Sequence, residues 1–347
     1  MKIAVIGDPH MGKRQYRTDE NNFNKYEHAG YKAFDEYVDK IIEEKPDLVV
    51  IPGDIYDKPN PPVLAMTKYF MGINRLIEAG IEVMAIEGNH DFSFINRNNK
   101  CSAAEMAPHT YYADYEIKTV IINDILFVMM PYLYDTDANI EAYLQKCKDI
   151  AVNSDCPRKV LVTHGVTEKY YKDSFIPDKM MFPDDTVEEF NFVIIGHIHT
   201  PFAYKQKDTV VLSPGAMIDY QAYTDRTGIT IIDTDTWHFN KIKIKTPHII
   251  KRNCDESNIN KILENVTEDI YHLSFKGDTS VIDNDLFIEA NKKSIQLAIE
   301  VVTEETVEET TEKKPTSLID IYSWVATHYK DYSEYFEAVK EARTGER

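Results

Sequence analysis

Five short apolar runs in this chain each end in side chains that can bind a metal ion. The runs and the polar residues after them are Ile3–Ile6 with Asp8 and His10, Leu48–Ile51 with Asp54 and Asp57, Val83–Ile86 with Asn89, His90 and Asp91, Val160–Val162 with His164, and Phe192–Ile195 with His197 and His199. A buried strand that leads directly into carboxylates or imidazoles is how an α/β protein places ligands along one edge of its sheet. Because the ligands are Asp, Asn and His without Cys, the pattern predicts a site for hard-to-borderline divalent ions.

Apolar residues recur at helical spacing between these runs. The segments Tyr31–Ile42 and Val63–Ile77 separate the first three runs, and Ile140–Ala151 precedes the fourth. A succession of strand, helix and strand implies right-handed βαβ crossovers and a largely parallel sheet.

Further strands are predicted in the middle of the chain. Ile117–Ile122 and Ile125–Met130 form alternating or apolar runs around Asn123-Asp124, which predicts a hairpin. Thr209–Leu212 and Gly228–Asp233 add two more strand-like segments. This strand content is sufficient for two packed sheets with helices outside them.

The last hundred residues differ in composition from the first part. After a main domain over residues 1–246, residues 247–302 contain strand-like Tyr271–Phe275 and Ile295–Val302 around helix-like Asp285–Ser294, which predicts a small α+β subdomain. Residues 303–314 are rich in Glu and Thr and predict a solvated linker. Residues 315–347 carry two short amphipathic helices, and their apolar faces require a partner surface.

Bulk composition restricts the functional class only in part. The chain of 347 residues is 43% hydrophobic and 28% charged, which is ordinary for a globular protein. Its formal charge of −19 opposes tight unaided binding to nucleic acid, although bound divalent cations would reverse the local field. The four cysteines lack CxxC spacing and predict free thiols in a reducing compartment. With no apolar leader and no apolar run approaching a membrane span, we expect a cytoplasmic protein that is not secreted.

The chemistry of phosphate esters gives these ligands a use. Two divalent ions roughly 3.5–4 Å apart neutralise the phosphate and lower the pKa of a bound water toward about 7. Such a pair needs one bridging carboxylate, and Asp54 is the natural candidate as the first carboxylate after the second strand.

A lone Gly-Asp pair is more often a turn, and a lone His-x-His is more often packing. Five of the eleven histidines nevertheless fall in these strand exits, which favours a metal site.

At this point a specific resemblance emerges. Asp-x-His, Gly-Asp-x-x-Asp, Gly-Asn-His-Asp, His-Gly and Gly-His-x-His in this order resemble the calcineurin-like metallophosphoesterase signature over roughly residues 1–235. The segments Asp8–Gly12, Asp54–Pro61 and Ser213–Ala216 are similar to the SbcD-type branch of DNA-repair nucleases, which includes the eukaryotic meiotic-recombination nuclease and phage versions. The resemblance implies a four-layer αββα sandwich with a small α+β capping subdomain and a C-terminal helical tail.

The resemblance also implies roles for individual residues. One ion would be held by Asp8, His10, Asp54 and His199, and the other by Asp54, Asn89, His164 and His197. His90 would protonate the leaving oxygen, and Asp91 would orient His90. The family's activating metal is Mn²⁺, which Asp, Asn and His ligation suits, with Mg²⁺ as the alternative.

Some positions depart from the family pattern. Ala216 stands where relatives commonly have Ser, and Asp57 stands where some relatives carry a histidine that influences exonuclease activity. The balance of exonuclease and endonuclease action therefore stays open. Lys13, Arg14 and Arg17 form the basic cluster beside a motif, and we interpret them as contacts to DNA phosphates, with a solvated loop as the alternative.

The leading hypothesis is a manganese-dependent DNA nuclease subunit. Its helices within residues 317–343 would bind the coiled coil of an SbcC-type ATPase in DNA repair or recombination, and the resemblance implies a homodimer through helices early in the chain. A viral version would act in the host cytoplasm. The polarity of digestion and the strand preference are not determined by the sequence.

Two other classes of function remain open, a different phosphoesterase and an inactive scaffold. A small-substrate phosphoesterase, such as a cyclic nucleotide phosphodiesterase, would leave the linker and terminal helices unexplained. A phosphoprotein phosphatase is disfavoured because Lys58-Pro59 follows Gly-Asp-x-x-Asp instead of Arg-Gly. A catalytically inactive scaffold is opposed by intact residues at all of the ligand positions.

Overall fold

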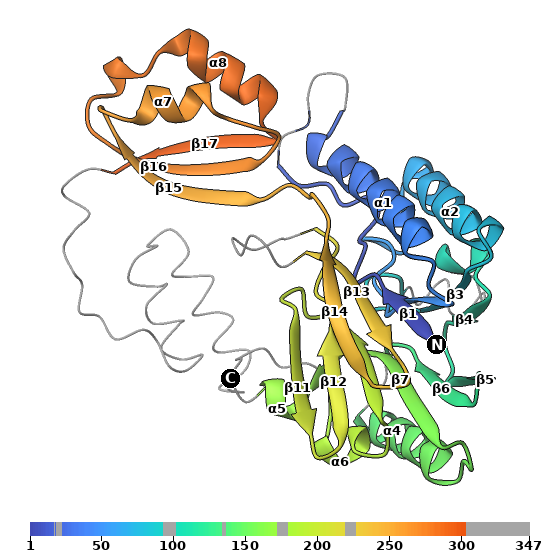
Figure 1. The fold of residues 1–347 in the computed structure, drawn as a ribbon. Helices are drawn as coiled ribbons and strands as arrows, with labels where there is room; N and C mark the ends of the chain where they lie inside the picture. Colours follow the sequence, from blue (N-terminus) through green and yellow to red (C-terminus); the bar gives the residue numbers. More distant parts are fainter. Residues whose placement is uncertain are drawn as a thin grey trace, which may run out of the picture. The chain divides into compact units, whose positions relative to one another are not determined.

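The computed structural model describes residues 1–16, 18, 23–92, 102–133, 137–171, 180–218 and 227–302 (Figure 1). Residues Met1–Val301 form one compact unit. Arg17, the linker at 303–314 and the helical tail at 315–347 lie outside the described residues, so the predictions made for them stay predictions. In the described part of the chain, no helix is long and apolar enough to span a membrane.

The first sheet carries the first three metal-site motifs. Its strand order is β14-β13-β1-β2-β3-β4, and β1 to β4 are parallel. β13 pairs antiparallel with β1, and β14 pairs antiparallel with β13. The strands are β1 (Lys2–Val5), β2 (Leu48–Ile51), β3 (Glu82–Ile86), β4 (Tyr111–Ala113), β13 (Gly228–Asp233) and β14 (His238–Lys243). Helices α1 (Lys25–Glu44) and α2 (Val63–Glu78) make the predicted crossovers.

The second sheet carries the remaining two motifs. Its order is β11-β12-β10-β7-β6-β5, and the central strands β12, β10, β7 and β6 are parallel. The strands are β5 (Lys118–Ile122), β6 (Ile125–Met130), β7 (Arg158–His164), β10 (Phe192–Gly196), β11 (Phe202–Gln206) and β12 (Thr209–Ser213). The predicted hairpin between β5 and β6 is confirmed, and both of its turn residues, Asn123 and Asp124, have positive φ as a type I′ turn requires.

Short elements and helices complete this part of the chain. They are the 3₁₀ turn η1 (Ala104–Met106), α4 (Asp137–Val152), α5 (Glu168–Tyr171) and α6 (Asp184–Val187), with the small two-stranded sheet of β8 (Val166–Thr167) and β9 (Met181–Phe182).

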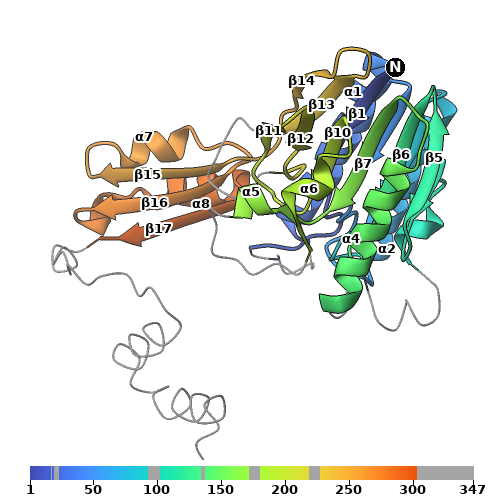
Figure 2. The same ribbon diagram turned by 90° about the horizontal axis from the view of Figure 1, so that it is seen from below.

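The sheets and helices form layers, which Figure 2 shows from below. Three buried clusters hold these layers together. Phe34 and Tyr69 pack from α1 and α2 onto the outer face of the first sheet. Val50 and Phe127 belong to the cluster between the two sheets. Leu144 packs from α4 onto the outer face of the second sheet. The expected four-layer αββα sandwich is therefore confirmed.

A smaller unit follows the sandwich. Strands β15 (Ile249–Asp255), β16 (Ile270–Lys276) and β17 (Gln296–Val301) form a parallel sheet with α7 (Ile259–Glu264), η2 (Thr279–Val281) and α8 (Asn284–Lys293). These elements have their own core, in which Phe275 is fully buried. The first strand and α7 escaped the sequence analysis because β15 is mostly exposed and polar after its first two residues. The division of the chain at residue 246 stays a prediction.

Candidate metal centre

The carboxyl ends of β1, β2 and β3 from one sheet meet those of β7 and β10 from the other. Four residues at these exits have positive φ: Asp8 (23°), His10 (43°), Asp54 (48°) and His197 (92°). A non-glycine residue in this region costs about 1–3 kcal/mol and commonly marks a functional site. The sharp turns allow side chains that follow buried strands to point back into the space between the two sheet edges.

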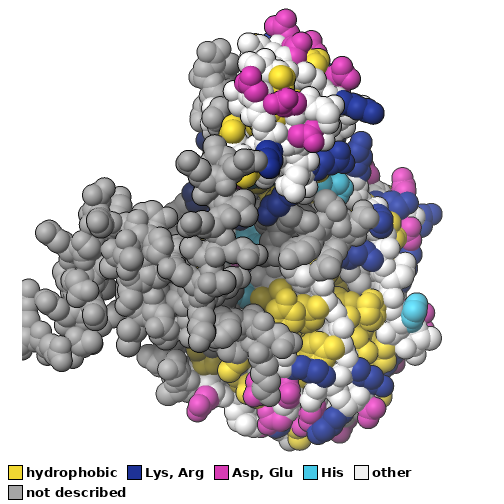
Figure 3. All heavy atoms as spheres, turned by 90° about the vertical axis from the view of Figure 1, so that its left-hand side faces the viewer, with side chains coloured by type: hydrophobic (Ala, Val, Ile, Leu, Met, Phe, Trp, Pro, Cys, Tyr) yellow, Lys and Arg dark blue, Asp and Glu magenta, His cyan; other side chains and the backbone are white. Residues whose placement is uncertain are grey.

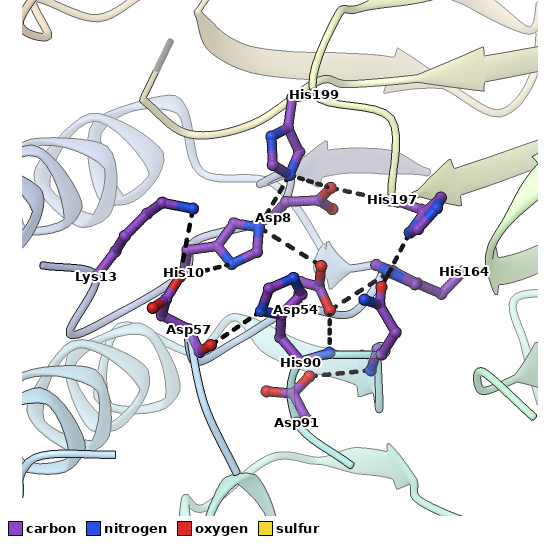
Figure 4. A network of polar contacts seen from close by, with 12 residues as sticks. Asp8, His10, Lys13, Asp54, Asp57, His90, Asp91, His164, His197 and His199 are labelled. Atoms are coloured by element: carbon purple, nitrogen blue, oxygen red, sulfur yellow. Dashed lines mark hydrogen bonds and ion pairs between the residues drawn. The ribbon is translucent and has the colours of Figure 1, made fainter. Parts of the chain in front are cut away.

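The first group of side chains consists of Asp8, His10, Asp54 and His199, whose ligand atoms lie within 4.8 Å of one another (Figure 4). The Nε2 atoms of His10 and His199 are 3.0 Å apart. Asp54 Oδ2 lies 3.5 Å from His10 Nε2, and Asp8 Oδ2 lies 3.9 Å from His199 Nε2. These are the four residues expected to hold one ion.

The second group uses the other oxygen of Asp54. Asp54 Oδ1 lies 3.4 Å from His164 Nε2. Asn89 Oδ1 lies 2.9 Å from both His164 Nε2 and His197 Nδ1. Because each carboxylate oxygen of Asp54 faces a different ligand group, this residue has the geometry of a bridge between two ions.

Backbone contacts fix which nitrogen of His164 faces the centre. His164 Nδ1 donates to the carbonyl oxygen of Pro52 at 2.7 Å, which leaves Nε2 for a metal. The backbones approach so closely here that a Cβ on Gly53 would lie 2.4 Å from His164 Nδ1, and one on Gly88 would lie 2.2 Å from the nitrogen of Asp54. The glycines in front of Asp54 and Asn89 are therefore packing requirements.

Two carboxylates tie the loops after β2 and β3 together. Asp54 Oδ1 accepts a hydrogen bond from the His90 backbone N–H at 2.8 Å. In return, the Asp91 carboxylate accepts from the backbone N–H groups of Tyr56 (2.8 Å), Gly88 (2.9 Å) and Ile55 (3.1 Å). Asp91 therefore acts on the loop that carries the bridging residue.

The ring of His90 is oriented by a different group from the one expected. Its Nδ1 donates to the backbone carbonyl oxygen of Asp57 at 2.9 Å. Its ring packs edge-on against His10, with the centroids 4.7 Å apart. Asp91 can influence His90 through the backbone, whereas the contact to the imidazole comes from Asp57.

Burial and mutual charge set the protonation of the centre. Burial raises the pKa of Asp8 well above its usual range, and the Asp54 charge adds to the effect. Burial would also raise the pKa of Asp54, but the charge of His164 outweighs it and holds this pKa well below the usual range. Burial opposes the charged form of His164, yet the charge of Asp54 raises its pKa to about 9. Burial lowers the pKa of His10 and lowers that of His199 to about 4.

These groups fit a pair of divalent cations. Two fully buried carboxylates meet four imidazoles and one amide oxygen, a donor set that suits hard-to-borderline ions. Asp8 Oδ1 is buried without a hydrogen-bond partner among the described residues. A cation in each group would satisfy this oxygen and compensate the two carboxylate charges.

The predicted phosphate contacts have acidic neighbours. Lys13 Nζ lies 3.3 Å from Asp57 Oδ1, whose carboxylate is also 3.8 Å from His10 Nδ1. Arg14 Nε donates to the buried Glu27 at 2.7 Å. A pocket of about 360 Å³ adjoins the centre and is lined by Met11, Gly12, Arg14, Asp57, Lys58, Asn60 and Pro62. The structure therefore brings Lys13 close to the ligand groups and Arg14 to the neighbouring pocket, while Arg17 lies outside the described residues.

One aromatic residue at this edge was missed by the sequence analysis. Tyr132 follows β6, and its ring centroid lies 6.0 Å from that of His164 and 6.1 Å from that of His197. The signal was available, because Ile125–Met130 is another apolar run that ends at this edge. No site residue was predicted after this run because Pro131 and Tyr132 are not metal ligands.

The pKa of His164 leads to a prediction about metal binding. In the metal-free protein this histidine is protonated at pH 7, but it must be neutral to bind a cation. Binding of Mn²⁺ at pH 7 is therefore expected to release at least one proton, and the affinity is expected to increase from pH 7 to pH 9. Isothermal titration calorimetry in buffers of different ionisation enthalpy measures this release. Binding without net proton release at pH 7 would contradict a protonated His164 in the metal-free protein.

Comparisons with known proteins agree with this geometry. A family model described as Calcineurin-like phosphoesterase matches residues 1–201. The DNA double-strand break repair protein Mre11 of Methanococcus maripaludis is 30% identical over 215 residues, which are 57% of this chain and 52% of that protein. The Mre11 protein of Methanocaldococcus jannaschii is 25% identical over 224 residues, which are 62% of this chain and 56% of that protein.

The chain thus spans about half the length of the curated relatives it matches. Among solved structures, the protein TT1561 of Thermus thermophilus is 10% identical with a TM-score of 0.45, covering 70% of this chain and 99% of that chain. The match over residues 1–201 covers more than half of the 347 residues and includes all of the strand-exit motifs. The chain therefore belongs to the calcineurin-like phosphoesterase family.

Proposed function

We propose that this chain is a nuclease that hydrolyses phosphodiester bonds of DNA with two divalent ions. The observation that carries the proposal is the division of the two Asp54 oxygens between the two ligand groups. The similarity to two DNA double-strand break repair proteins supports DNA as the substrate. We propose Mn²⁺ as the metal, with Mg²⁺ as the alternative, because both accept carboxylate and amide oxygens and Mn²⁺ also suits imidazole.

The residues of the chain have distinct tasks in this reaction. Bound metal ions would supply neutralisation of the phosphate charge and a more acidic attacking water. Asp54 sets the separation of the two ligand groups, and Asp91 holds the loop that carries Asp54. His90 has its Nδ1–H engaged by the Asp57 carbonyl, which leaves Nε2 as the ring atom that would pass a proton to the leaving oxygen.

Positive charge for binding DNA is local. Lys13 and Arg14 flank the centre and the adjoining pocket, and Lys58 lines the same pocket. Their charge is partly compensated by Asp57 and Glu27, so phosphate binding would exchange one anionic partner for another. This arrangement, together with the net charge of −19, favours a DNA-binding partner such as an SbcC-type ATPase. We propose that the helices within residues 317–343 bind that ATPase.

A second copy of the chain is proposed to pack on α2. The solvent face of this helix carries Val63 (78% exposed), Leu64 (43%), Phe70 (47%) and Met71 (56%). These residues recur with a seven-residue period, so they form one apolar stripe along the helix. A stripe of this kind on a chain with strong net charge is best covered by an identical stripe in a two-fold dimer.

The nuclease proposal is tested by activity on DNA and by a substitution of His90, the proposed general acid. With Mn²⁺, the wild type is expected to cleave linear single-stranded or duplex DNA, alone or with its ATPase partner. His90→Asn is expected to reduce the rate about 10²- to 10⁴-fold, because general acid catalysis is lost. The number of bound metal ions, measured by mass spectrometry, should stay at the wild-type value.

The matched control is His238→Asn, which changes an exposed histidine on β14. This variant should cleave at the wild-type rate. A wild type that cleaves neither form of DNA would contradict the proposed function, and an active His90→Asn variant would remove the proposed role of His90.

The dimer is tested by placing charge in the stripe. Phe70→Glu combined with Met71→Glu is expected to convert a dimer into a monomer, because buried unpaired carboxylates oppose association. Sedimentation equilibrium measures the mass. Ile121→Glu on β5, which is 61% exposed, is the control and should leave the dimer intact. A wild type that is monomeric at all concentrations, or a double variant that remains dimeric, would refute this interface.

A further inference from the structure

Tyr132 reaches the metal centre from a strand that supplies no ligand. β6 is parallel to β7, with Phe127 opposite Val160 and Met130 opposite Thr163. The chain leaves β6 at the same edge where His164 leaves β7. The next residues, Pro131 and Tyr132, therefore lie beside the second ligand group.

The backbone of Tyr132 is fixed independently of its ring. Its N–H donates to the carbonyl oxygen of Glu87 at 3.0 Å, which joins the exit of β6 to the exit of β3. Glu87 is itself 2% exposed and lies two residues before Asn89. The ring is half-buried and inclined by 34° to the ring of His197 and by 73° to that of His164.

The two histidines have contacts of their own that orient them. His164 is held at Nδ1 by the Pro52 carbonyl and faces Asn89 with Nε2. The backbone N–H of His197 donates to Asp8 Oδ2, and its ring Nδ1 contacts Asn89 Oδ1. The half-buried ring of Tyr132 lies beside these two oriented imidazoles, where an aromatic face can meet a nucleobase.

The ring also lies on a defined side of the centre. In Figure 4, His10 and His90 lie on one side of the Asp54 carboxylate, and His164 and His197 lie on the other. Tyr132 belongs to the second side through its ring contacts. If His90 faces the leaving oxygen, the nucleotide that retains the scissile phosphate lies on the side of Tyr132.

The surrounding surface is suited to a flat apolar group. Figure 3 faces the side of the molecule where β11 and α5 lie, and hydrophobic side chains gather there next to histidines. Phe202 on β11 stacks on Tyr170 of α5, with centroids 4.2 Å apart. Tyr132 and Phe202 pack against the same buried cluster, although β7, β10 and β12 separate their strands. The aromatic ring of Tyr132, beside His164 and His197, fits the face of a nucleobase better than it fits another phosphate.

We propose that Tyr132 stacks on the base of the nucleotide that retains the scissile phosphate, and so makes the enzyme selective for phosphodiesters that carry a base at this position. The inference rests on the proposed nuclease function. Stacking is tolerant of sequence because every base has a π-face. The contact would therefore select nucleotides over other phosphodiesters without selecting among the four bases.

The test combines variants of Tyr132 with substrates that lack one base. Single-stranded hexanucleotides with one abasic residue are cleaved in Mn²⁺, and kcat/KM is measured for the linkage on each side of the abasic position. With a normal substrate, Tyr132→Ala and Tyr132→Leu are expected to lose about tenfold to a hundredfold in kcat/KM, and Tyr132→Phe should retain it. When the base on the phosphate-retaining side is removed, kcat/KM of the wild type should fall by the same factor. On this abasic substrate, Tyr132→Ala should have the same kcat/KM as the wild type.

Tyr143→Leu is the matched control, because Tyr143 packs on the same cluster from α4. It should cleave both substrates as the wild type does. A Tyr132→Ala variant that cleaves normal DNA at the wild-type rate would overturn the inference. The inference would also be overturned if Tyr132→Ala lost the same factor in kcat/KM on normal and abasic substrates, because a residue that only packs against the histidines produces that result. A loss that depends on the base of the leaving side would overturn it as well. A wild type inactive on all of the DNA substrates would instead overturn the proposed nuclease function.

Discussion

The structure of the site depends on the way in which one carboxylate, that of Asp54, faces two groups of imidazoles at once. Its Oδ2 is directed to His10 and its Oδ1 to His164, although the two histidines come from different sheets. Taking a carboxylate out of water is strongly unfavourable unless it is paired and hydrogen-bonded. The surrounding loops are arranged to satisfy this requirement. Asp54 is 1% exposed and accepts the His90 N–H, and Asp91 secures the backbone that follows it.

The sandwich architecture makes this convergence possible. Parallel strands in each sheet end at the same edge, and the cluster around Val50 and Phe127 holds the two sheets face to face. Ligands from β1, β2 and β3 therefore oppose ligands from β7 and β10 across a narrow space. Left-handed residues at Asp8, His10 and Asp54 turn the chain shortly after β1 and β2. The backbone strain is supported by the buried strands that precede these residues.

Much of this site could be predicted because metal ligation depends on residue type and spacing. The seven expected ligands and His90 lie together where the strand ends meet, as the strand-exit pattern predicted. Their division between two ions and the role of His90 came from the family resemblance. Contacts made by backbone atoms could not be predicted, since any residue offers a carbonyl. The Asp57 carbonyl on His90 and the three N–H groups on Asp91 are of this kind. Tyr132 was missed for a different reason, because tyrosine is not a metal ligand of this pattern and an aromatic residue after a strand is ambiguous.

An acidic chain is compatible with a phosphate-directed site of this kind. A net charge of −19 describes the whole surface, whereas two divalent ions at Asp54 would dominate the local field. Electron paramagnetic resonance of the protein loaded with Mn²⁺ tests most directly whether Asp54 bridges two ions. A bridging Asp54 predicts the spectrum of an exchange-coupled pair in the wild type and loss of that coupling in Asp54→Asn. A wild-type spectrum of isolated, uncoupled Mn²⁺ ions at full loading would contradict it.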